Sequence, residues 1–258
     1  MNYKKLNSDI ISWIKNYAEK HNMSTLVVGI SGGIDSAVVS TLCAKTGIDT
    51  IVVSMPIKQI ESQNNLSINH GSWLTKKYNN VKHEIIDMTN IFLEIEFKFE
   101  NINYSTLHAL ANTRARLRML VLYQIAGTNN GLVVGTGNKI EDFGIGFFTK
   151  YGDGGVDISP IGDCMKSDVW EMGKELNISK NIIDAPPTDG LWDDGRTDAD
   201  QLKGLNYQQL ENAMKLDELN KTTNTYTESE LELLEKYIKI RKPNLHKMFE
   251  IPVFKLKK

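Results

Sequence analysis

One turn of the sequence, between an apolar run and a helical one, gathers five glycine or polar residues: Ser31, Gly32, Gly33, Asp35 and Ser36. Because the two glycines lack a Cβ, the backbone amides of this turn can point inward. The serine hydroxyls add further donors, and the following helix brings the positive end of its dipole to the same point. The segment therefore predicts a cradle for an anion, of which phosphate is the common biological case.

Asp35 does not fit a pure anion site, because a carboxylate repels phosphate unless a cation lies between them. Mg²⁺ resolves this conflict, since it binds one or two carboxylates together with phosphate oxygens. The alternative is an ordinary tight turn in which Asp35 only caps the helix. Two common phosphate motifs do not apply: the sequence has no Gly-Lys-Ser/Thr ending of a Walker A motif, and "GTGNKI" (135–140) has Ile140 where a dinucleotide fingerprint needs its third glycine.

The elements that must position this turn follow from apolar periodicity. We predict strands over 24–30, 50–56, 83–88 and 131–138, and helices over 6–20, 36–47, 104–127, 167–176, 206–214 and 227–240. Strands that alternate with helices indicate an α/β fold, a parallel sheet with helices on both faces. Two loop-rich stretches, about 142–165 and 184–204, are long enough to be binding loops or disordered segments.

Composition limits the class of protein. The chain has 258 residues, 41% of them hydrophobic, which we expect to form one domain over 1–258. A net charge of −2 gives no basic field that would recruit nucleic acid, and no apolar run is long enough to cross a membrane. The N-terminus lacks the apolar core of a signal peptide, so we expect a cytoplasmic location. Two cysteines make neither a disulfide framework nor a zinc site, and we expect both to be packing residues.

The segment Ser-Gly-Gly-x-Asp-Ser after a strand resembles the pyrophosphate loop of the N-type ATP pyrophosphatases. These enzymes cleave ATP between its α and β phosphates to activate a substrate as an adenylate. The resemblance implies a Rossmann-like open sheet of the adenine nucleotide alpha hydrolase type. The superfamily includes GMP synthetase, tRNA-modifying enzymes and NAD synthetase, and the loop alone does not choose among them.

Four further motifs make the chain similar to the ammonia-dependent NAD synthetases. They are "NTRARLRML" (112–120), "GTGNKIED" (135–142), "GFFTKYGDGGVDISPIGD" (146–163) and "GLWDDGRTD" (190–198), and the similarity returns at "HKMFEIPVF" (246–254). The resemblance implies that ammonia and ATP convert deamido-NAD to NAD through an NAD-adenylate, releasing AMP and pyrophosphate. It also implies a homodimer. The segment 141–147 is one residue longer than in some members of the family.

The resemblance also implies the site residues. ATP is expected at Gly29, Ile30, Ser31, Gly32, Gly33, Ile34, Asp35, Ser36, Thr136, Lys166 and Thr188. Mg²⁺ is expected on Asp35 and Glu141, and deamido-NAD at Arg116, Lys150, Asp157, His246 and Lys247. Lys166 is expected to offset phosphate charge, and Asp157 to orient the nicotinate or to accept a proton from ammonium, so both are the expected catalytic residues.

Each expected ligand outside the turn also has an ordinary interpretation as a surface residue. Arg114 and Arg118 share one face of the helix 104–127 and Arg116 lies roughly opposite, so one of these sets is open to solvent. His246 is also compatible with an ordinary surface histidine, and Lys247 with a basic tail that includes Lys255, Lys257 and Lys258. Two other functions remain open at this stage: another adenylating pyrophosphatase, such as a GMP-synthetase-like or tRNA-modifying enzyme, and a nucleotide sensor without turnover.

Overall fold

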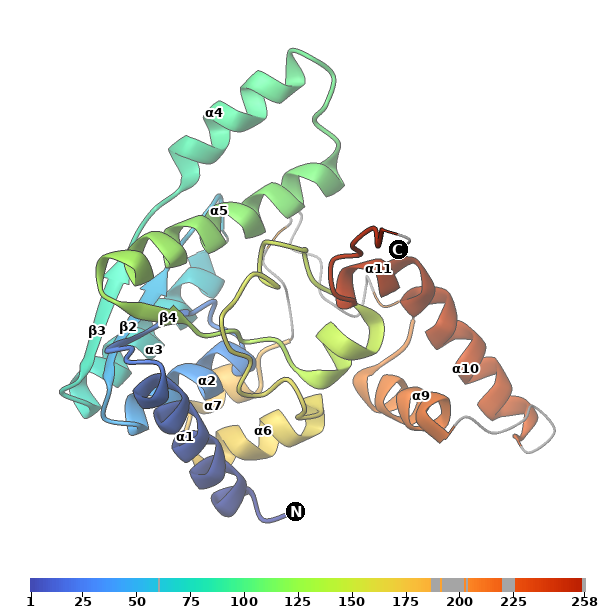
Figure 1. The fold of residues 1–258 in the computed structure, drawn as a ribbon, viewed down its shortest axis with the longest axis horizontal. Helices are drawn as coiled ribbons and strands as arrows, with labels where there is room; N and C mark the ends of the chain where they lie inside the picture. Colours follow the sequence, from blue (N-terminus) through green and yellow to red (C-terminus); the bar gives the residue numbers. More distant parts are fainter. Residues whose placement is uncertain (60, 187–190, 192–201, 203, 220–225, 257–258) are drawn as a thin grey trace.

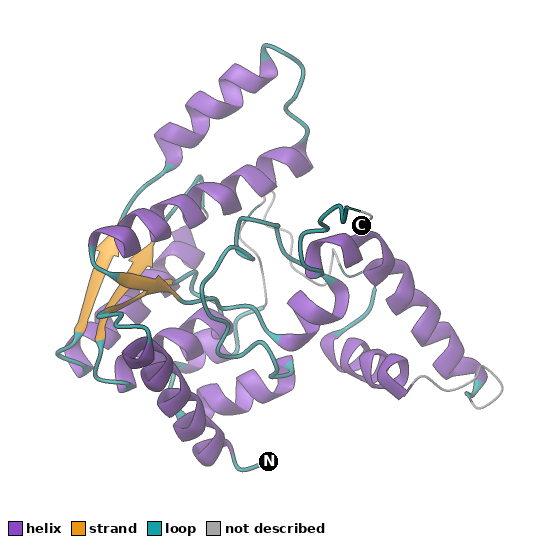
Figure 2. Ribbon diagram, viewed as in Figure 1, coloured by secondary structure: helices purple, strands orange, loops and turns teal. Residues whose placement is uncertain are grey.

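The fold is a four-stranded parallel sheet enclosed by helices (Figures 1 and 2). The computed structural model describes residues 1–59, 61–186, 191, 202, 204–219 and 226–256. The strands are β1 (Thr25–Gly29), β2 (Asp49–Ser54), β3 (Val81–Ile85) and β4 (Gly131–Val133), and their order in the sheet is β3-β2-β1-β4. Each pairing is parallel, with Val27 of β1 in register with Ile51 of β2 and Val133 of β4. The predicted parallel α/β sheet is therefore confirmed.

Helices cover both faces of the sheet, as the continuous apolar character of the central strands requires. The helices α1 (Tyr3–Lys20), α2 (Ile34–Lys45), α6 (Lys166–Glu175) and α7 (Lys180–Ile183) share one buried cluster with Leu26 and Val28 of β1. On the opposite face, α4 (Thr89–Glu100) and α5 (Leu107–Thr128) pack on a cluster that contains Val27. Successive side chains of β1 thus enter different cores. The helix α3 (Glu61–Lys77) packs on β2 and β3.

The C-terminal part of the chain forms a smaller helical layer next to α6, on the side of the molecule away from β2 and β3 (Figure 1). The helices α9 (Tyr207–Leu219) and α10 (Glu228–Arg241) form an antiparallel pair, the C-terminal hairpin, which η3 (Lys242–Asn244) and α11 (Leu245–Met248) follow. Its buried residues share a third cluster with Ile140 and Ile145 of η1, a π-helix over Lys139–Ile145. The hairpin is thereby joined to the segment that follows β4.

The sequence analysis did not identify α4. In residues 93–100 the apolar and charged side chains alternate, which is not the pattern of an amphipathic helix. Only Phe92 of α4 is buried, so this helix keeps most of its apolar side chains on the surface. The fourth strand is also shorter than the predicted 131–138, since it ends at Val133. Cys43 and Cys164 are free and buried, as expected of packing residues. No helix in the described part of the chain is long and apolar enough to cross a membrane.

A buried histidine makes the stability of this fold depend on pH. His70 of α3 is 4% exposed, and its Nε2 lies 3.0 Å from Ser40 Oγ of α2. Burial lowers the pKa of His70 to about 4, against 6.5 for an exposed histidine. Below pH 6.5 the unfolded chain therefore takes up a proton that the folded chain does not.

We predict that the free energy of unfolding falls between about pH 6.5 and pH 4, with His70 contributing about 3 kcal/mol of that loss. The variant His70→Gln should lose this contribution. Urea unfolding at a series of pH values measures it, and the exposed His108→Gln serves as the matched control. Equal pH slopes for His70→Gln and the unaltered protein would contradict the assignment.

Candidate active site

A cavity of about 530 Å³ opens at the carboxyl ends of β1 and β4. β2 and β3 follow β1 on one side of the sheet and β4 lies on its other side, so the direction of strand addition reverses at β1, and open α/β sheets bind ligands at such a switch point. The cavity is lined by the turn after β1, the segment after β4, and parts of α3, α5 and α6. Among its lining residues are all the predicted ATP contacts from Gly29 to Ser36, with Thr136 and Lys166. Thr188, the last of them, lies outside the described residues.

The turn after β1 has the geometry of an anion cradle. Gly32 has φ of +89°, a left-handed conformation that favours glycine. The N–H of Ser31 donates to Ser36 Oγ at 3.1 Å, and the N–H of Gly33 donates to Ser31 Oγ at 3.2 Å. Helix α2 starts at Ile34 with Gly33 as its N-cap, so no side chain caps its first amides. These amides are available to an anion, because the N-terminal N–H groups of a helix have no partner within it.

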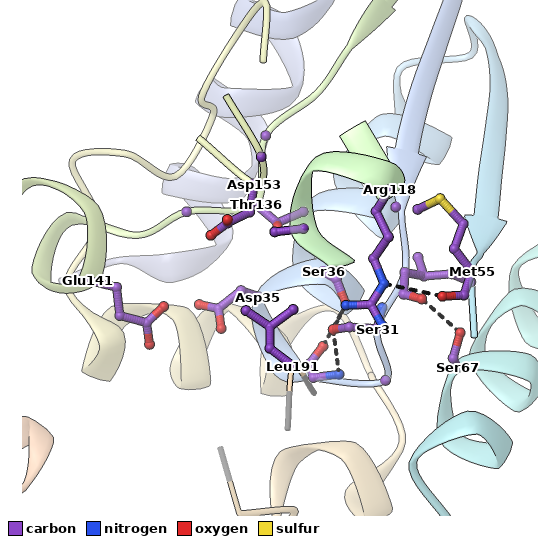
Figure 3. A pocket seen from close by; sticks show the side chains of 18 of the residues that line it. Ser31, Asp35, Ser36, Met55, Ser67, Arg118, Thr136, Glu141, Asp153 and Leu191 are labelled. Atoms are coloured by element: carbon purple, nitrogen blue, oxygen red, sulfur yellow. Dashed lines mark hydrogen bonds between the residues drawn. The ribbon is translucent and has the colours of Figure 1, made fainter. Parts of the chain in front are cut away.

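Asp35 does not cap this helix, which excludes the ordinary-turn interpretation. Its Oδ2 accepts a hydrogen bond from Lys166 Nζ at 2.5 Å, and the same ammonium donates to Glu141 Oε1 at 2.8 Å. Lys166 is only 2% exposed. Figure 3 shows Asp35 and Glu141 pointing toward each other in the pocket. Three residues from distant parts of the sequence thus form one buried ion triad, named below the Asp35–Lys166–Glu141 triad.

The three charges determine one another's protonation. Burial disfavours the ammonium of Lys166, but the two carboxylates outweigh it and raise its pKa. Burial raises the pKa of Asp35, against the opposing effect of Lys166. Burial acts on Glu141 in the same direction, but Lys166 and a hydrogen bond from Tyr207 outweigh it and lower the pKa. The triad therefore keeps a cation between two acidic groups beside the anion cradle.

Two residues that the sequence analysis did not identify hold the triad in place. Asn138, fully buried, donates to Asp35 Oδ1 at 3.0 Å and accepts from the N–H groups of Ile140 and Glu141. Tyr207 of α9 donates its hydroxyl to Glu141 Oε1 at 2.6 Å. Asn138 lies in the GTGNKIED motif (135–142) and Tyr207 at the start of a predicted helix, but no feature of the sequence connects either residue to Asp35 or Glu141, so their roles follow only from which segments meet.

Glu141 lies on the π-helix η1, a rare conformation that occurs often at functional sites. Asn244 donates to the carbonyl of Ile145, and Arg241 donates to the carbonyls of Phe143 and Gly144. The C-terminal hairpin and its extension thus satisfy the last carbonyls of η1.

The other end of the cavity is apolar. Met55, Leu66, Met119 and Leu122 line it, and a Cβ on Gly29 would come within 3.2 Å of the Met55 side chain. Arg118 donates to the backbone carbonyl of Met55 at 3.2 Å (Figure 3). This compartment can hold a flat apolar ring, with the anion cradle at its mouth.

The residues expected to bind a second substrate lie outside the lining of this cavity. Four of them form one group: Arg116 Nε donates to the carbonyl of Lys150, Lys150 Nζ donates to that of His246, and Lys247 Nζ donates to that of Phe148. The exposed Arg116 lies away from the cavity that Arg118 enters, as the helical spacing predicts. The structure therefore brings α5, the loop near 150 and the C-terminal segment together.

Asp157 is exposed, and both of its carboxylate oxygens already accept hydrogen bonds. Oδ2 accepts from the N–H of Val133 and Oδ1 from the hydroxyl of Tyr123. The acids of this region that line the cavity are instead Asp153 and Asp142. Burial and the nearby Asp153 raise the pKa of Asp142 well above its usual value. Asp153 lies between two glycines and Asp142 next to Glu141, and no feature of the sequence marks either acid, rather than Asp157, as a cavity residue.

The cavity has the donor set that Mg²⁺ with a phosphate ligand requires. Within the described residues no three His, Cys, Asp or Glu side chains gather as a metal cage. Mg²⁺ is usually held by one or two carboxylates, with phosphate and water completing its shell. Asp35 and Glu141 already share a cation beside the cradle, so these two residues fit the ion.

Comparison with known proteins gives consistent matches over almost the whole chain. The model of the NAD synthase family matches residues 6–251. The NH(3)-dependent NAD(+) synthetase of Finegoldia magna is 37% identical over 240 residues, which are 93% of this chain and 92% of that protein. The structure of NMN synthetase from Francisella tularensis has a TM-score of 0.85 at 30% identity, and the NH3-dependent NAD synthetase of Campylobacter jejuni one of 0.79 at 28%. Both alignments cover 99% of this chain and 100% of the other.

We predict that Lys166→Met destabilises the protein by about 3–5 kcal/mol in metal-free buffer, because two buried carboxylates lose their cation. The loss should shrink on acidification to about pH 5, since protonation of a carboxylate removes the repulsion. Urea unfolding measures both effects. Lys174→Met on the same helix is the control, because its pair with Glu171 is exposed and should contribute less than about 1 kcal/mol. A Lys166→Met variant as stable as this control would refute the role of the triad.

Proposed function

Because the chain belongs to the NAD synthase family, we propose that it amidates deamido-NAD to NAD with ammonia and ATP, releasing AMP and pyrophosphate. The observation that carries the proposal is the Asp35–Lys166–Glu141 triad beside an uncapped helix N-terminus. This arrangement suits a polyphosphate that arrives with a divalent cation. The match to a relative of similar length supports free ammonia as the nitrogen donor and a single domain over 1–258.

We place ATP with its adenine in the apolar compartment and its phosphates on the turn Ser31–Ser36. Thr136 lies on the opposite wall, and Lys166 between the two carboxylates. Mg²⁺ bound to Asp35 and Glu141 would neutralise phosphate charge. Thr188 remains an expected contact from the loop 184–204.

The first step joins the nicotinate carboxylate to the α-phosphorus of ATP as the bond to the β-phosphate oxygen breaks. The leaving pyrophosphate gains charge, and the inward N–H groups at the start of α2 stabilise that charge. Lys166 offers a buried ammonium to the same oxygens. The contribution of the chain is mainly position and electrostatics, as in phosphoryl transfer generally.

In the second step, ammonia attacks the carbonyl carbon of the adenylate, AMP leaves, and one proton is lost from nitrogen. Asp153 faces the cavity and is placed to receive that proton. The proposed role of Asp157 is to hold the segment 153–157 against β4 and α5, through Val133 and Tyr123. Arg116, Lys150, His246 and Lys247 are proposed to bind the far part of the dinucleotide.

A mononucleotide acceptor is the second candidate substrate. The Francisella tularensis structure with a TM-score of 0.85 is titled an NMN synthetase. Amidation of nicotinate mononucleotide would use the same carboxylate and the same ATP chemistry. The dinucleotide is favoured because the Finegoldia magna relative, an NH(3)-dependent NAD(+) synthetase, has the higher sequence identity to this chain, 37% against 30%. The two acceptors are separated by comparing their kcat/KM values with the same enzyme.

We predict that Mg-ATP, ammonium and deamido-NAD yield AMP, pyrophosphate and NAD in equal amounts. Asp35→Asn and Glu141→Gln should each lower kcat/KM for ATP by at least about 100-fold, because each removes a charge from the metal site. Asp49→Asn, an exposed acid of β2, is the matched control. Formation of AMP without NAD would indicate that another acceptor is adenylated. Formation of ADP would indicate a different reaction. Binding of ATP without any turnover would indicate a nucleotide sensor.

We also propose a homodimer in which a second copy covers the apolar surface of α4 and α5. This surface is formed by Ile91, Leu93, Phe97, Phe99, Leu107 and Leu120, all exposed in the single chain. Figure 1 shows α4 on the side of α5 that is away from α2 and α6. Contiguous apolar surface of this kind usually marks an interface. Arg116 and Tyr123 also lie on α5, so the second copy would approach the proposed dinucleotide site.

We predict that the protein sediments at twice the mass of one chain, and that Phe97→Glu shifts it to the monomer. Phe97 is 64% exposed, and a charge placed there would be desolvated at the interface. Phe254→Glu, at an exposed apolar residue of the C-terminal segment, should leave the dimer intact. Analytical ultracentrifugation distinguishes these outcomes, and a monomeric unaltered protein would exclude the dimer.

A further inference from the structure

A chain of hydrogen bonds runs from β3 to the start of the anion cradle, behind the cavity. His83 Nε2 lies 2.8 Å from Ser54 Oγ at the end of β2, and Ser54 Oγ lies 2.6 Å from Ser67 Oγ of α3. Ser67 then donates to the backbone carbonyl of Ile30 at 2.8 Å. Ser54 and Ser67 are 1% and 3% exposed, so water does not compete for these bonds. Figure 3 shows Ser67 beside Met55 at the wall of the pocket.

The direction of every bond in this chain follows from its last member. A carbonyl oxygen can only accept a hydrogen bond, so Ser67 donates its single hydroxyl proton to the carbonyl of Ile30. Ser54 must therefore donate to Ser67, which leaves Ser54 without a proton for His83. The Nε2 of His83 must then carry a proton and donate it to Ser54. The chain thus runs in one direction, from the imidazole to the carbonyl.

We propose that His83, Ser54 and Ser67 form a positioning relay that fixes the first peptide of the anion cradle for ATP binding. The proposal rests on the proposed function only in taking ATP as the ligand of the cradle. Within the relay, Ser67 touches the loop directly, and His83 and Ser54 act through it.

The relay fixes the loop because a trans peptide is rigid. The carbonyl of Ile30 and the N–H of Ser31 belong to one peptide plane and point in opposite directions. With the carbonyl held by Ser67, the N–H of Ser31 points to Ser36 Oγ at 3.1 Å. The N–H of Ile30 is held separately by the carbonyl of Val53 at 2.9 Å. Loss of the Ser67 bond leaves this plane held only by the Ser31 N–H bond to Ser36, so the start of the cradle is positioned less firmly.

The packing of α3 is adapted to the imidazole. A Cβ on Gly71, one turn after Ser67, would lie 2.4 Å from the His83 ring. The glycine therefore allows the ring to reach Ser54. Burial lowers the pKa of His83, so the ring is neutral at neutral pH and carries a single proton. The tautomer of His83 therefore shows the direction of the hydrogen bonds in the relay, because a proton on Nε2 means that His83 donates to Ser54.

The first test is the tautomer of His83, read from the ¹⁵N shifts of the imidazole at neutral pH in the ligand-free protein. The expected result is a protonated Nε2 and an unprotonated Nδ1. The opposite tautomer would overturn the relay, because Ser54 would then have to donate to His83 and could not donate to Ser67. This test does not depend on any catalytic activity.

The second test is the affinity for Mg²⁺ with α,β-methylene-ATP, measured by calorimetry without an acceptor. Ser67→Ala should weaken binding about fivefold to tenfold, since it removes one buried hydrogen bond on the loop. Ser72→Ala, on the same helix and outside the cavity lining, should bind as the unaltered protein does. Urea unfolding of each variant reports separately on its effect on stability.

Variants of His83 separate positioning from packing. The amide nitrogen of His83→Gln occupies the place of Nε2 and should preserve affinity within about twofold, whereas that of His83→Asn is too short to reach Ser54 and should weaken binding as Ser67→Ala does. The double variant Ser67→Ala/His83→Asn should bind no worse than Ser67→Ala alone, because His83 acts through Ser67. Additive losses, or equal losses for Gln and Asn, would refute the relay. If the analogue binds but the unaltered enzyme forms no NAD, the proposed function fails while the relay is still tested.

Discussion

The site depends on one buried ammonium placed between two carboxylates. Lys166 donates to Asp35 and to Glu141 from a position almost closed to water. A buried charge without partners is unstable by several kcal/mol, so these three residues must lie together once the chain is folded. The three segments that carry them start helices α2 and α6 and the π-helix η1. Their common point of contact determines where the phosphate cradle meets the acids.

The rest of the structure supports this triad from two sides. From the sheet side, β2, β3 and α3 hold the start of the cradle through Ser54, His83 and Ser67. From the C-terminal side, the hairpin reaches Glu141 through Tyr207 and reaches the carbonyls of η1 through Arg241 and Asn244. Ser167, near the start of α6, binds Glu211 of α9 through both its N–H and its hydroxyl. The N-cap of α6 is Met165, so the acid of α9 supplies an acceptor to the first turn of this helix.

The accuracy of the sequence analysis differs between kinds of interaction. The cradle was predictable because its glycines, serines and helix start are neighbours in the chain, and local geometry decides their arrangement. Lys166 and Glu141 followed only from a family resemblance, since no spacing joins residues that are 25 positions apart. Asp153 and Asp157 look alike in a glycine-rich loop, yet only Asp153 lines the cavity. Helix α4 was not predicted, because its alternating apolar and charged side chains hide the helical period.

The sequence by itself determined the parallel α/β sheet, the turn at Ser31–Ser36 and the need for a cation beside Asp35. The sheet depends on the periodicity of apolar residues, the turn on the conformational freedom of glycine, and the cation on the repulsion between a carboxylate and a phosphate. The first two of these act over a few residues of the chain, and the third over a few ångströms. Only the tertiary structure decided that Lys166 supplies a cation, that Asn138 and Tyr207 orient the acids, and that α3 holds the cradle from behind. These are contacts between residues as many as 131 positions apart, and the packing of the helices on the sheet brings them together.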